Sequence, residues 1–268
     1  MIGGENEQEE DTMAKVEYGL QMYCLRDITG KDLKGALRQA AEMGYKHIEF
    51  AGFFGHPAEE VKSWLDELGL VCSGTHTGGD ALAEDKIMDT VAYHKIIGCK
   101  DLIIPGMDWS TLEKHEQNIA LISRALPVLA ENGIRLSYHN HSDEFFTTPY
   151  GRVIEEEIVS RTGAALEIDT FWAFNAGVDP VAFCEEHKDR IRVIHLKDGV
   201  PCKPECRSWG RSGEGVEGCS VGTGEAPVLA VRQWCLDNDV LMVIESEGLD
   251  PTGPEEVKRC IDFLRTLD

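Results

Sequence analysis

The stretch LSYHNHSDEFF, Leu136 to Phe146, places two histidines one residue apart between an apolar run and an acidic, aromatic segment. His139 and His141 share a face if the apolar run is a strand, because strand side chains alternate between two faces. Such a pair can bind a metal ion, transfer protons or fill a turn. The choice depends on which other residues the fold brings to the same place.

Polar residues also follow, or lie within, other apolar runs of strand length. They are Arg26, Glu49, His76, Asp169, His195 with Lys197, and Glu245 with Glu247. If the first member of each pair faces inward, four consecutive strands bring His139, Asp169, His195 and Glu245 into one small volume. Nitrogen and carboxylate donors in this mix suit a divalent Mn, Co, Fe or Zn ion, with Mn²⁺ favoured, better than Ca²⁺.

Strand-like runs alternate with amphipathic, helix-length segments along the chain. The predicted strands are 16–22, 47–50, 71–74, 101–105, 134–138, 165–169, 191–196 and 241–245. The predicted helices are 32–43, 58–68, 82–97, 110–131, 153–159, 180–187, 226–238 and 254–267, and several are followed by a glycine that can end a helix. Eight such units predict an α/β fold of the (β/α)₈ TIM-barrel type, with its site at the C-terminal strand ends. An open doubly wound sheet is the competing fold, but no glycine-rich phosphate motif follows the first strand.

Length and charge limit the classes of function. The 268 residues lack a linker that would divide them, so we expect one barrel domain over residues 15–268 behind an acidic, disordered tail, residues 1–14. The net charge of −22 disfavours nucleic-acid and membrane partners. Without a signal-peptide pattern or a transmembrane run, a cytoplasmic protein is expected, with its nine cysteines reduced.

Residues next to the four candidate ligands have alternative roles. Lys197 and Asp198 are placed either to touch a substrate or to form ion pairs, and Glu247 is expected to contact the ligands rather than the ion. Glu167 precedes Asp169 by two positions, so it is expected one layer deeper in the barrel as a structural partner. Trp172 is expected to form a pocket wall, with core packing as the alternative.

Seven motifs occur in an order similar to the xylose isomerase-like TIM-barrel superfamily. They are LQMYCLRD, HIEFAG, YHNHSDEFF, LEIDTFWAFNAGVDP, VIHLKDG, VGTGEAP and VIESEG. The chain resembles the sugar phosphate isomerase/epimerase branch, which includes inosose dehydratase and the ketose 3-epimerases. The resemblance implies a carbohydrate substrate and one divalent metal ion held by Glu, Asp, His and Glu from strands five to eight. It also carries over the expectation of a homo-oligomer.

The chain departs from that implied quartet at its first position. Asp169, His195 and Glu245 match the pattern, but His139 stands where the family has glutamate, because the usual E-N-H reads H-N-H. In the epimerases the two metal-bound glutamates also act as the acid/base pair, so the symmetrical scheme is in doubt for this chain. A neutral imidazole also leaves the ion about one charge more positive than a carboxylate does.

The leading hypothesis is an isomerase or epimerase that abstracts a proton next to a carbonyl of a sugar, keto-sugar or inositol-like substrate, through an enediolate. Glu245 is the candidate base and His141 the candidate second proton carrier. Glu49, His76, Lys197, Trp172 and Arg26 are the candidate substrate-binding residues. No Arg/Lys cluster is present to hold a phosphate, so an unphosphorylated substrate is expected.

Three alternatives remain open at this stage. A lyase or dehydratase would start from the same enediolate and eliminate a β-substituent. An endonuclease IV-like repair enzyme shares the fold, but the charge and the scarcity of ligands for three metal ions argue against it. A non-catalytic sugar-binding barrel would have lost its chemistry at the altered strand-five position.

Overall fold

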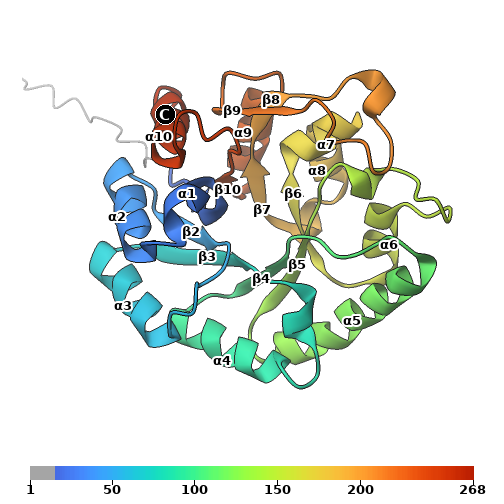
Figure 1. The fold of residues 1–268 in the computed structure, drawn as a ribbon, viewed down its shortest axis with the longest axis horizontal. Coiled ribbons are helices and arrows are strands. Elements are labelled where there is room, and N and C mark those ends of the chain that lie inside the picture. The colour runs from blue at the N-terminus through green and yellow to red at the C-terminus, as the bar shows by residue number, and fades with distance from the viewer. Residues whose placement is uncertain (1–15) are drawn as a thin grey trace, which may run out of the picture.

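The computed structural model describes residues 16–268, and the expected disordered tail, residues 1–14, lies outside the described residues. Eight parallel strands close into one barrel in the order β1-β10-β7-β6-β5-β4-β3-β2, with helices around it (Figure 1). The barrel strands are β1 (Gly19–Gln21), β2 (His47–Phe50), β3 (Val71–His76), β4 (Asp101–Ile104), β5 (Arg135–His139), β6 (Ala165–Asp169), β7 (Ile191–Leu196) and β10 (Leu241–Ile244). The predicted TIM-barrel fold is confirmed.

The helices follow the barrel strands and cover the outside of the barrel (Figure 1). They are α1 (Arg26–Thr29), α2 (Leu33–Met43), α3 (Ala58–Leu68), α4 (Ile87–Ile97), α5 (Leu112–Glu131), α6 (Ile154–Arg161), α7 (Thr170–Ala176), α8 (Pro180–Glu186), α9 (Val228–Asn238) and α10 (Gly253–Arg265). Three of the expected stop glycines, Gly44, Gly69 and Gly98, are helix C-caps in the left-handed conformation, which glycine adopts without steric cost.

The spacing of apolar residues explains how the helices attach to the strands. In α2 the buried side chains are Leu33, Ala36, Leu37 and Ala40, which follow the i, i+3, i+4, i+7 pattern of a one-sided helix. The facing strands are buried on both sides, as all four residues of β4 illustrate. The apolar core therefore lies between the strands and the helix layer, which leaves the barrel interior available for polar side chains.

Several element boundaries differ from those expected. The strand β1 covers only three residues of the predicted 16–22, because Met22–Leu25 turns into a 3₁₀ helix. Glu245 lies just beyond the end of β10 rather than within it. Two short strands, β8 (Asp198–Val200) and β9 (Glu217–Cys219), form an antiparallel pair outside the barrel that was not predicted. No helix among residues 16–268 is both long enough and apolar enough to span a membrane.

One buried acid gives the fold a testable pH dependence. Glu155 in α6 is 2% exposed, and neither of its carboxylate oxygens has a hydrogen-bond partner. Burial, helped by nearby Glu144, raises the pKa of Glu155 to about 8 from an ordinary 4.5. The folded state therefore retains a proton that the unfolded chain releases, so stability is lost as the pH rises from about 4.5 to 8.

We expect Glu155→Gln to remove this part of the pH dependence. The loss in the wild type at pH 7 is on the order of 3 kcal/mol in the free energy of unfolding. Urea unfolding between pH 4.5 and 8 measures it, with the exposed neighbour Glu156→Gln as the matched control. Parallel pH profiles for the two variants would contradict the assignment to Glu155.

Candidate active site

A cavity of about 470 Å³ opens at the C-terminal ends of the barrel strands. We call it the barrel mouth, and it is lined by Tyr23, Ala51, His76, Pro105, His139, His141, Trp172, Glu245 and Glu247. Each residue lies at the end of a barrel strand or in the segment that follows it. This is the face at which (β/α)₈ barrels carry their active sites.

The four predicted metal ligands lie together at the base of this cavity. His139, Asp169, His195 and Glu245 are all buried, and each offers one donor atom so that the four atoms lie within 4.8 Å of one another. The Oδ2 atom of Asp169 has no hydrogen-bond partner although it is buried. A buried carboxylate oxygen is costly without a hydrogen-bond partner, and the 3.6 Å from Oδ2 to Lys197 Nζ is too long for one. This oxygen and the mixed N/O donor set therefore fit a divalent transition metal ion.

A second group of donors lies one layer deeper. Glu167 Oε1 is 2.9 Å from His76 Nε2, 3.1 Å from His139 Nδ1 and 3.1 Å from His195 Nε2. These four residues also satisfy the distance requirement for a metal site. Because His139 and His195 belong to both groups, the described residues do not provide separate ligand sets for several ions.

Glu49 also lies in the deeper layer. It is fully buried, and its Oε1 is 2.7 Å from His195 Nε2 and accepts a hydrogen bond from Gln21 Nε2 at 2.6 Å. We expected Glu49 to bind substrate hydroxyls, but it is absent from the lining of the barrel mouth. The third residue of a four-residue strand lies too deep for that role, whereas His76, at the end of β3, does line the cavity.

The protonation of the cluster follows from its burial. Burial lowers the pKa of His139 well below its ordinary value, helped by His195 and His76, so this imidazole is neutral, as metal binding requires. Burial raises the pKa of Asp169 to about 7, and burial together with Glu49 raises the pKa of Glu167 to about 8. Buried carboxyl groups of this kind keep their protons when no cation is near, and a cation beside them favours the ionised form.

Lys197 joins three acidic side chains above the cluster. Its side chain is 1% exposed, and Nζ lies 2.6 Å from Glu247 Oε1, 3.5 Å from Glu245 Oε2 and 3.6 Å from Asp169 Oδ2. The ammonium group also lies 4.6 Å from the ring centroid of Trp172. Burial alone would lower the pKa of Lys197, but these carboxylates raise it above its ordinary value, so the residue is charged. Of the two roles expected for Lys197, substrate contact or ion pairing, the structure shows ion pairing.

The two residues after His139 have different roles. Asn140 is buried, donates to the backbone carbonyl of Asp169 at 3.2 Å and accepts from its backbone N–H at 3.0 Å. It thereby fixes the end of β6 to the end of β5. His141 lines the barrel mouth, and its ring centroid lies 5.0 Å from that of His139. Burial lowers the pKa of His141, which leaves a neutral ring facing the cavity.

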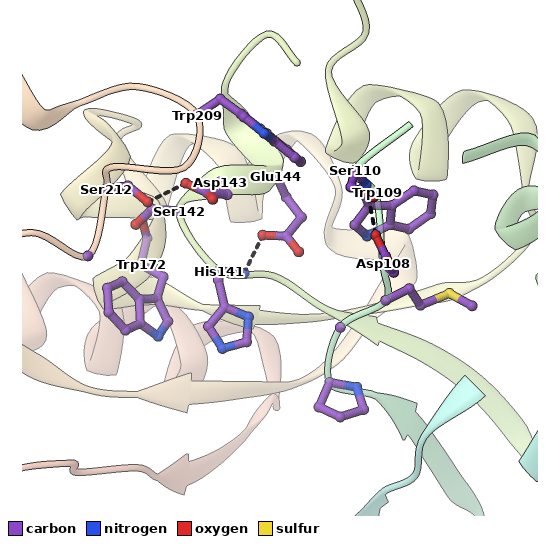
Figure 2. Close-up of a pocket in the computed structure, with 14 residues that line it drawn as sticks. Asp108, Trp109, Ser110, His141, Ser142, Asp143, Glu144, Trp172, Trp209 and Ser212 are labelled. Atoms are coloured by element: carbon purple, nitrogen blue, oxygen red, sulfur yellow. Dashed lines mark hydrogen bonds between the residues drawn. The ribbon is translucent and has the colours of Figure 1, made fainter. Parts of the chain in front are cut away.

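Arg26 does not face the barrel mouth, where we had expected it to bind substrate. Its guanidinium donates to the backbone carbonyls of Tyr23 and Glu247 at 3.1 and 2.9 Å, so it joins two loops at the rim. Trp172 does form a wall, because α7 begins directly after Asp169. A second, larger cavity of about 790 Å³ adjoins the mouth (Figure 2).

Sequence reasoning placed Glu167 one layer deeper as a structural partner, but it missed the three histidines that Glu167 contacts and the walls of the larger cavity. Glu167 is the cross-strand neighbour of His139 in the β5–β6 register, and strand parity already placed it on the same face as Asp169. Trp209 and Ser212 line the larger cavity from the segment between β8 and β9. That segment has neither strand nor helix periodicity, so nothing in the sequence pattern placed it over the barrel.

The chain matches known proteins along most of its length. The model of the family "Xylose isomerase-like TIM barrel" matches residues 37–267, so the chain belongs to this family. An inosose dehydratase from Geobacillus kaustophilus is 25% identical in an alignment 186 residues long, which covers 60% of this chain and 60% of that protein.

Solved structures share the fold over nearly the whole chain. A sugar phosphate isomerase/epimerase from Parabacteroides distasonis superposes with a TM-score of 0.75 at 20% identity, covering 97% of each chain. A probable 3-DHS dehydratase involved in petrobactin synthesis, from Bacillus anthracis, gives a TM-score of 0.71 at 12% identity, covering 93% of this chain and 99% of that one. At these identities the likeness concerns the fold.

Asp198 has a role that neither alternative anticipated. It is buried, Oδ1 accepts from the backbone N–H groups of Gly199 and Ala226, and Oδ2 accepts from those of Gly222 and Gly224, at 2.9–3.1 Å. The carboxylate thus joins the VIHLKDG and VGTGEAP motifs. It is a structural anchor rather than a substrate contact or an ion-pair partner.

We therefore expect Asp198→Asn to destabilise the protein. The amide has only one acceptor oxygen, so two of the four backbone N–H groups lose their partner, at a cost of about 2 kcal/mol in the free energy of unfolding. Urea unfolding measures the change, and the same substitution at exposed Asp85 is the control. An unfolding midpoint for Asp198→Asn equal to that of the control would contradict the anchoring role.

Proposed function

We propose that this protein is a divalent-metal-dependent enzyme of carbohydrate metabolism, with isomerase or epimerase chemistry that starts with proton abstraction next to a carbonyl. The convergence of His139, Asp169, His195 and Glu245 on one point beneath the barrel mouth carries the proposal. Membership of the xylose isomerase-like family and the sugar phosphate isomerase/epimerase among similar structures support a carbohydrate as the substrate class.

The upper donor group is the better candidate for the metal site. Both groups have two members that line the barrel mouth, but the upper group offers two carboxylates, Asp169 and Glu245. The deeper group offers one carboxylate, Glu167, whose Oε1 already contacts His76, His139 and His195. In this position Glu167 orients the rings of His139 and His195, as carboxylates commonly do behind metal-bound histidines.

The residues of the site divide the chemistry among them. A bound divalent ion would stabilise negative charge that develops on the substrate oxygens. Glu245 is the proposed base: burial alone would raise its pKa, but Lys197 and His195 lower it well below the ordinary value, so its carboxylate is ionised and able to accept a proton. Lys197 holds Glu245 at the edge of the cavity by their 3.5 Å contact.

His141 is the proposed second proton carrier. It faces the barrel mouth from the segment after β5, and it is neutral, so it can take up a proton and return it. In this arrangement a glutamate and a histidine share the work of an acid/base pair, and His139 keeps only the role of a ligand. Such an unsymmetrical pair is suited to isomerisation, in which a proton moves between neighbouring atoms.

Elimination is the second candidate reaction. The relative from Geobacillus kaustophilus is an inosose dehydratase, and elimination begins with the same proton abstraction by Glu245. His141 would then protonate the leaving group instead of a substrate carbon. The two reactions differ in their products, since only elimination releases water or another leaving group.

Metal content tests the ligand assignment. We expect His139→Ala and Asp169→Asn to lose most of the bound metal, because each removes a donor from the site. Glu167→Gln leaves the donors in place and should weaken metal affinity about 10- to 100-fold. Elemental analysis after dialysis against Mn²⁺ and Zn²⁺ measures this. His47→Ala is the control, because His47 lies at the N-terminal end of β2, away from the strand ends that carry the site.

The order of the effects distinguishes the two donor groups. If Glu167→Gln lost its metal while Asp169→Asn retained it, the ion would belong to the deeper group. Unchanged metal content in His139→Ala would give that residue a structural role only.

Proton exchange tests the chemistry. With metal-loaded protein in D₂O, we expect a substrate among keto-sugars and inososes to take up deuterium next to its carbonyl. Glu245→Gln should slow this exchange by about 10²-fold or more, the usual contribution of a general base. NMR measures the exchange, and the exposed Glu156→Gln variant controls for preparation. Exchange at the wild-type rate in Glu245→Gln would remove Glu245 from the role of base.

A further inference from the structure

The larger cavity beside the barrel mouth has no role in the proposed chemistry. We call it the aromatic groove, and it is formed by residues 105–110, residues 141–144, Trp172, and the segment carrying Trp209 and Ser212. It shares Pro105, His141 and Trp172 with the barrel mouth, so the two cavities are continuous. At about 790 Å³ it is larger than the mouth of about 470 Å³, and a substrate confined to the mouth leaves it empty.

Three tryptophans surround this groove. Figure 2 shows His141 between Trp172 on one side and Trp109 on the other, with Trp209 across the cavity from His141. Trp109 is 4% exposed and its Nε1 donates to Tyr138, whereas Trp172 and Trp209 are partly exposed. Flat apolar faces of this kind bury a large area of a ring-shaped ligand at little entropic cost.

One polar group in the groove lacks a partner. The indole Nε1 of Trp172 is buried and donates no hydrogen bond within the protein. A buried N–H usually has an acceptor. A ligand oxygen, such as a hydroxyl or an ether oxygen that joins two rings, can serve as one at the junction of the two cavities.

The charges of the groove exclude an anionic ligand. Its described lining contains Asp108, Asp143 and Glu144 but neither lysine nor arginine. Glu144 accepts from Tyr138 Oη and from the backbone N–H of His141, and Asp143 accepts from Ser212 Oγ and the backbone N–H of Gly210. Asp108 is likewise engaged, by the backbone N–H of Ser110 and by Lys114 Nζ. The three acids therefore repel phosphate and carboxylate but leave no free carboxylate oxygen to attract a cation, so the ligand of the groove is uncharged.

The outer wall of the groove is preformed. Asn175 Nδ2 donates to Ser142 Oγ and to the backbone carbonyl of Ser212, each at 2.8 Å, and Asn175 Oδ1 accepts from Cys202 N–H at 2.7 Å. Asn175 is fully buried. These bonds fix the segment between β8 and β9 to α7 and to the loop after β5, so Trp209 has a defined place without a ligand.

We propose that the aromatic groove binds an uncharged ring joined to the sugar that reacts in the barrel mouth, so that the substrate is a neutral glycoside whose reacting sugar carries a keto group. This inference rests on the proposed function, because it takes the mouth to be the place of the reacting sugar. The ring is an aryl group or a second sugar, since both present a flat apolar face and are joined to the reacting sugar through an oxygen that can accept a hydrogen bond. Trp209 and Trp172 set this specificity, and Trp209 lies outside the catalytic residues.

Binding of matched glycosides tests the proposal. The probes are the methyl and 4-nitrophenyl β-glycosides of glucose, galactose and xylose, together with cellobiose and glucose 6-phosphate, in calorimetric titrations of the metal-loaded wild type. The methyl and 4-nitrophenyl glycosides carry no keto group, so they report on binding without reacting. We expect a 4-nitrophenyl glycoside or cellobiose to bind at least about tenfold tighter than the methyl glycoside of the same sugar. Which of the two binds tighter identifies the ring as aryl or sugar.

Variants of the groove separate its contribution from that of the mouth. Trp209→Ala should remove the tenfold advantage and leave the affinity for the methyl glycoside unchanged, whereas Trp209→Phe should restore most of it. Trp64→Ala in α3, outside both cavities, is the matched control and should keep the advantage.

Three results would overturn the proposal. They are equal affinity for the methyl and extended glycosides, equal weakening of both by Trp209→Ala, and tighter binding of glucose 6-phosphate than of every neutral probe. A failure of all the extended glycosides to bind at millimolar concentration would also overturn it. Deuterium exchange reports separately on the proposed function: a protein that binds extended glycosides through Trp209 but exchanges no proton retains the subsite and loses the chemistry.

Discussion

The carboxylate of Glu167 is the interaction on which the interior of the barrel depends. Its Oε1 contacts His76, His139 and His195, which come from β3, β5 and β7. These strands meet only because the sheet closes, and the shared carboxylate then fixes the direction of all three rings. Isolated buried charges are costly, so the acids and bases here are stable only as a mutually paired set. The positions of the candidate ligands follow from this pairing.

The contacts of Glu167 also explain how the barrel accommodates His139 in place of a glutamate at the end of β5. His139 replaces the glutamate that the family resemblance implies, and its cross-strand neighbour in the register is Glu167. A carboxylate is therefore present beside the altered position, one layer deeper and on the next strand. It contacts His139 Nδ1 at 3.1 Å and so can orient the ring toward the mouth. The site retains a carboxylate at this corner of the barrel, but it lies behind the candidate ligand His139 and does not take its place.

The sequence predicts most of the fold because each barrel strand carries a buried run and each helix a one-sided apolar stripe. Strand parity also predicts that His139, Asp169, His195 and Glu245 lie together, and their donor atoms lie within 4.8 Å of one another. Depth along a strand is harder to predict. Glu49 and His76 were assigned the same role, yet Glu49 lies in the deeper layer while His76 lines the mouth. The hydrogen-bond partners of Asp198 could not be predicted from the sequence, because they are backbone N–H groups, which nearly every residue type has.

The clamp at Asp198 has a consequence for how this protein can change over generations. Asp198 joins the beginning of the segment between β7 and α9 to its end. The residues between these two points can therefore change in length or composition without moving His195 or Lys197. That stretch carries Trp209, a wall of the aromatic groove. The residues proposed to select the ligand and those proposed to react thus lie largely in different segments of the chain. Mutations confined to the segment between β8 and β9 could therefore change the substrate during evolution without altering the candidate ligands at the strand ends.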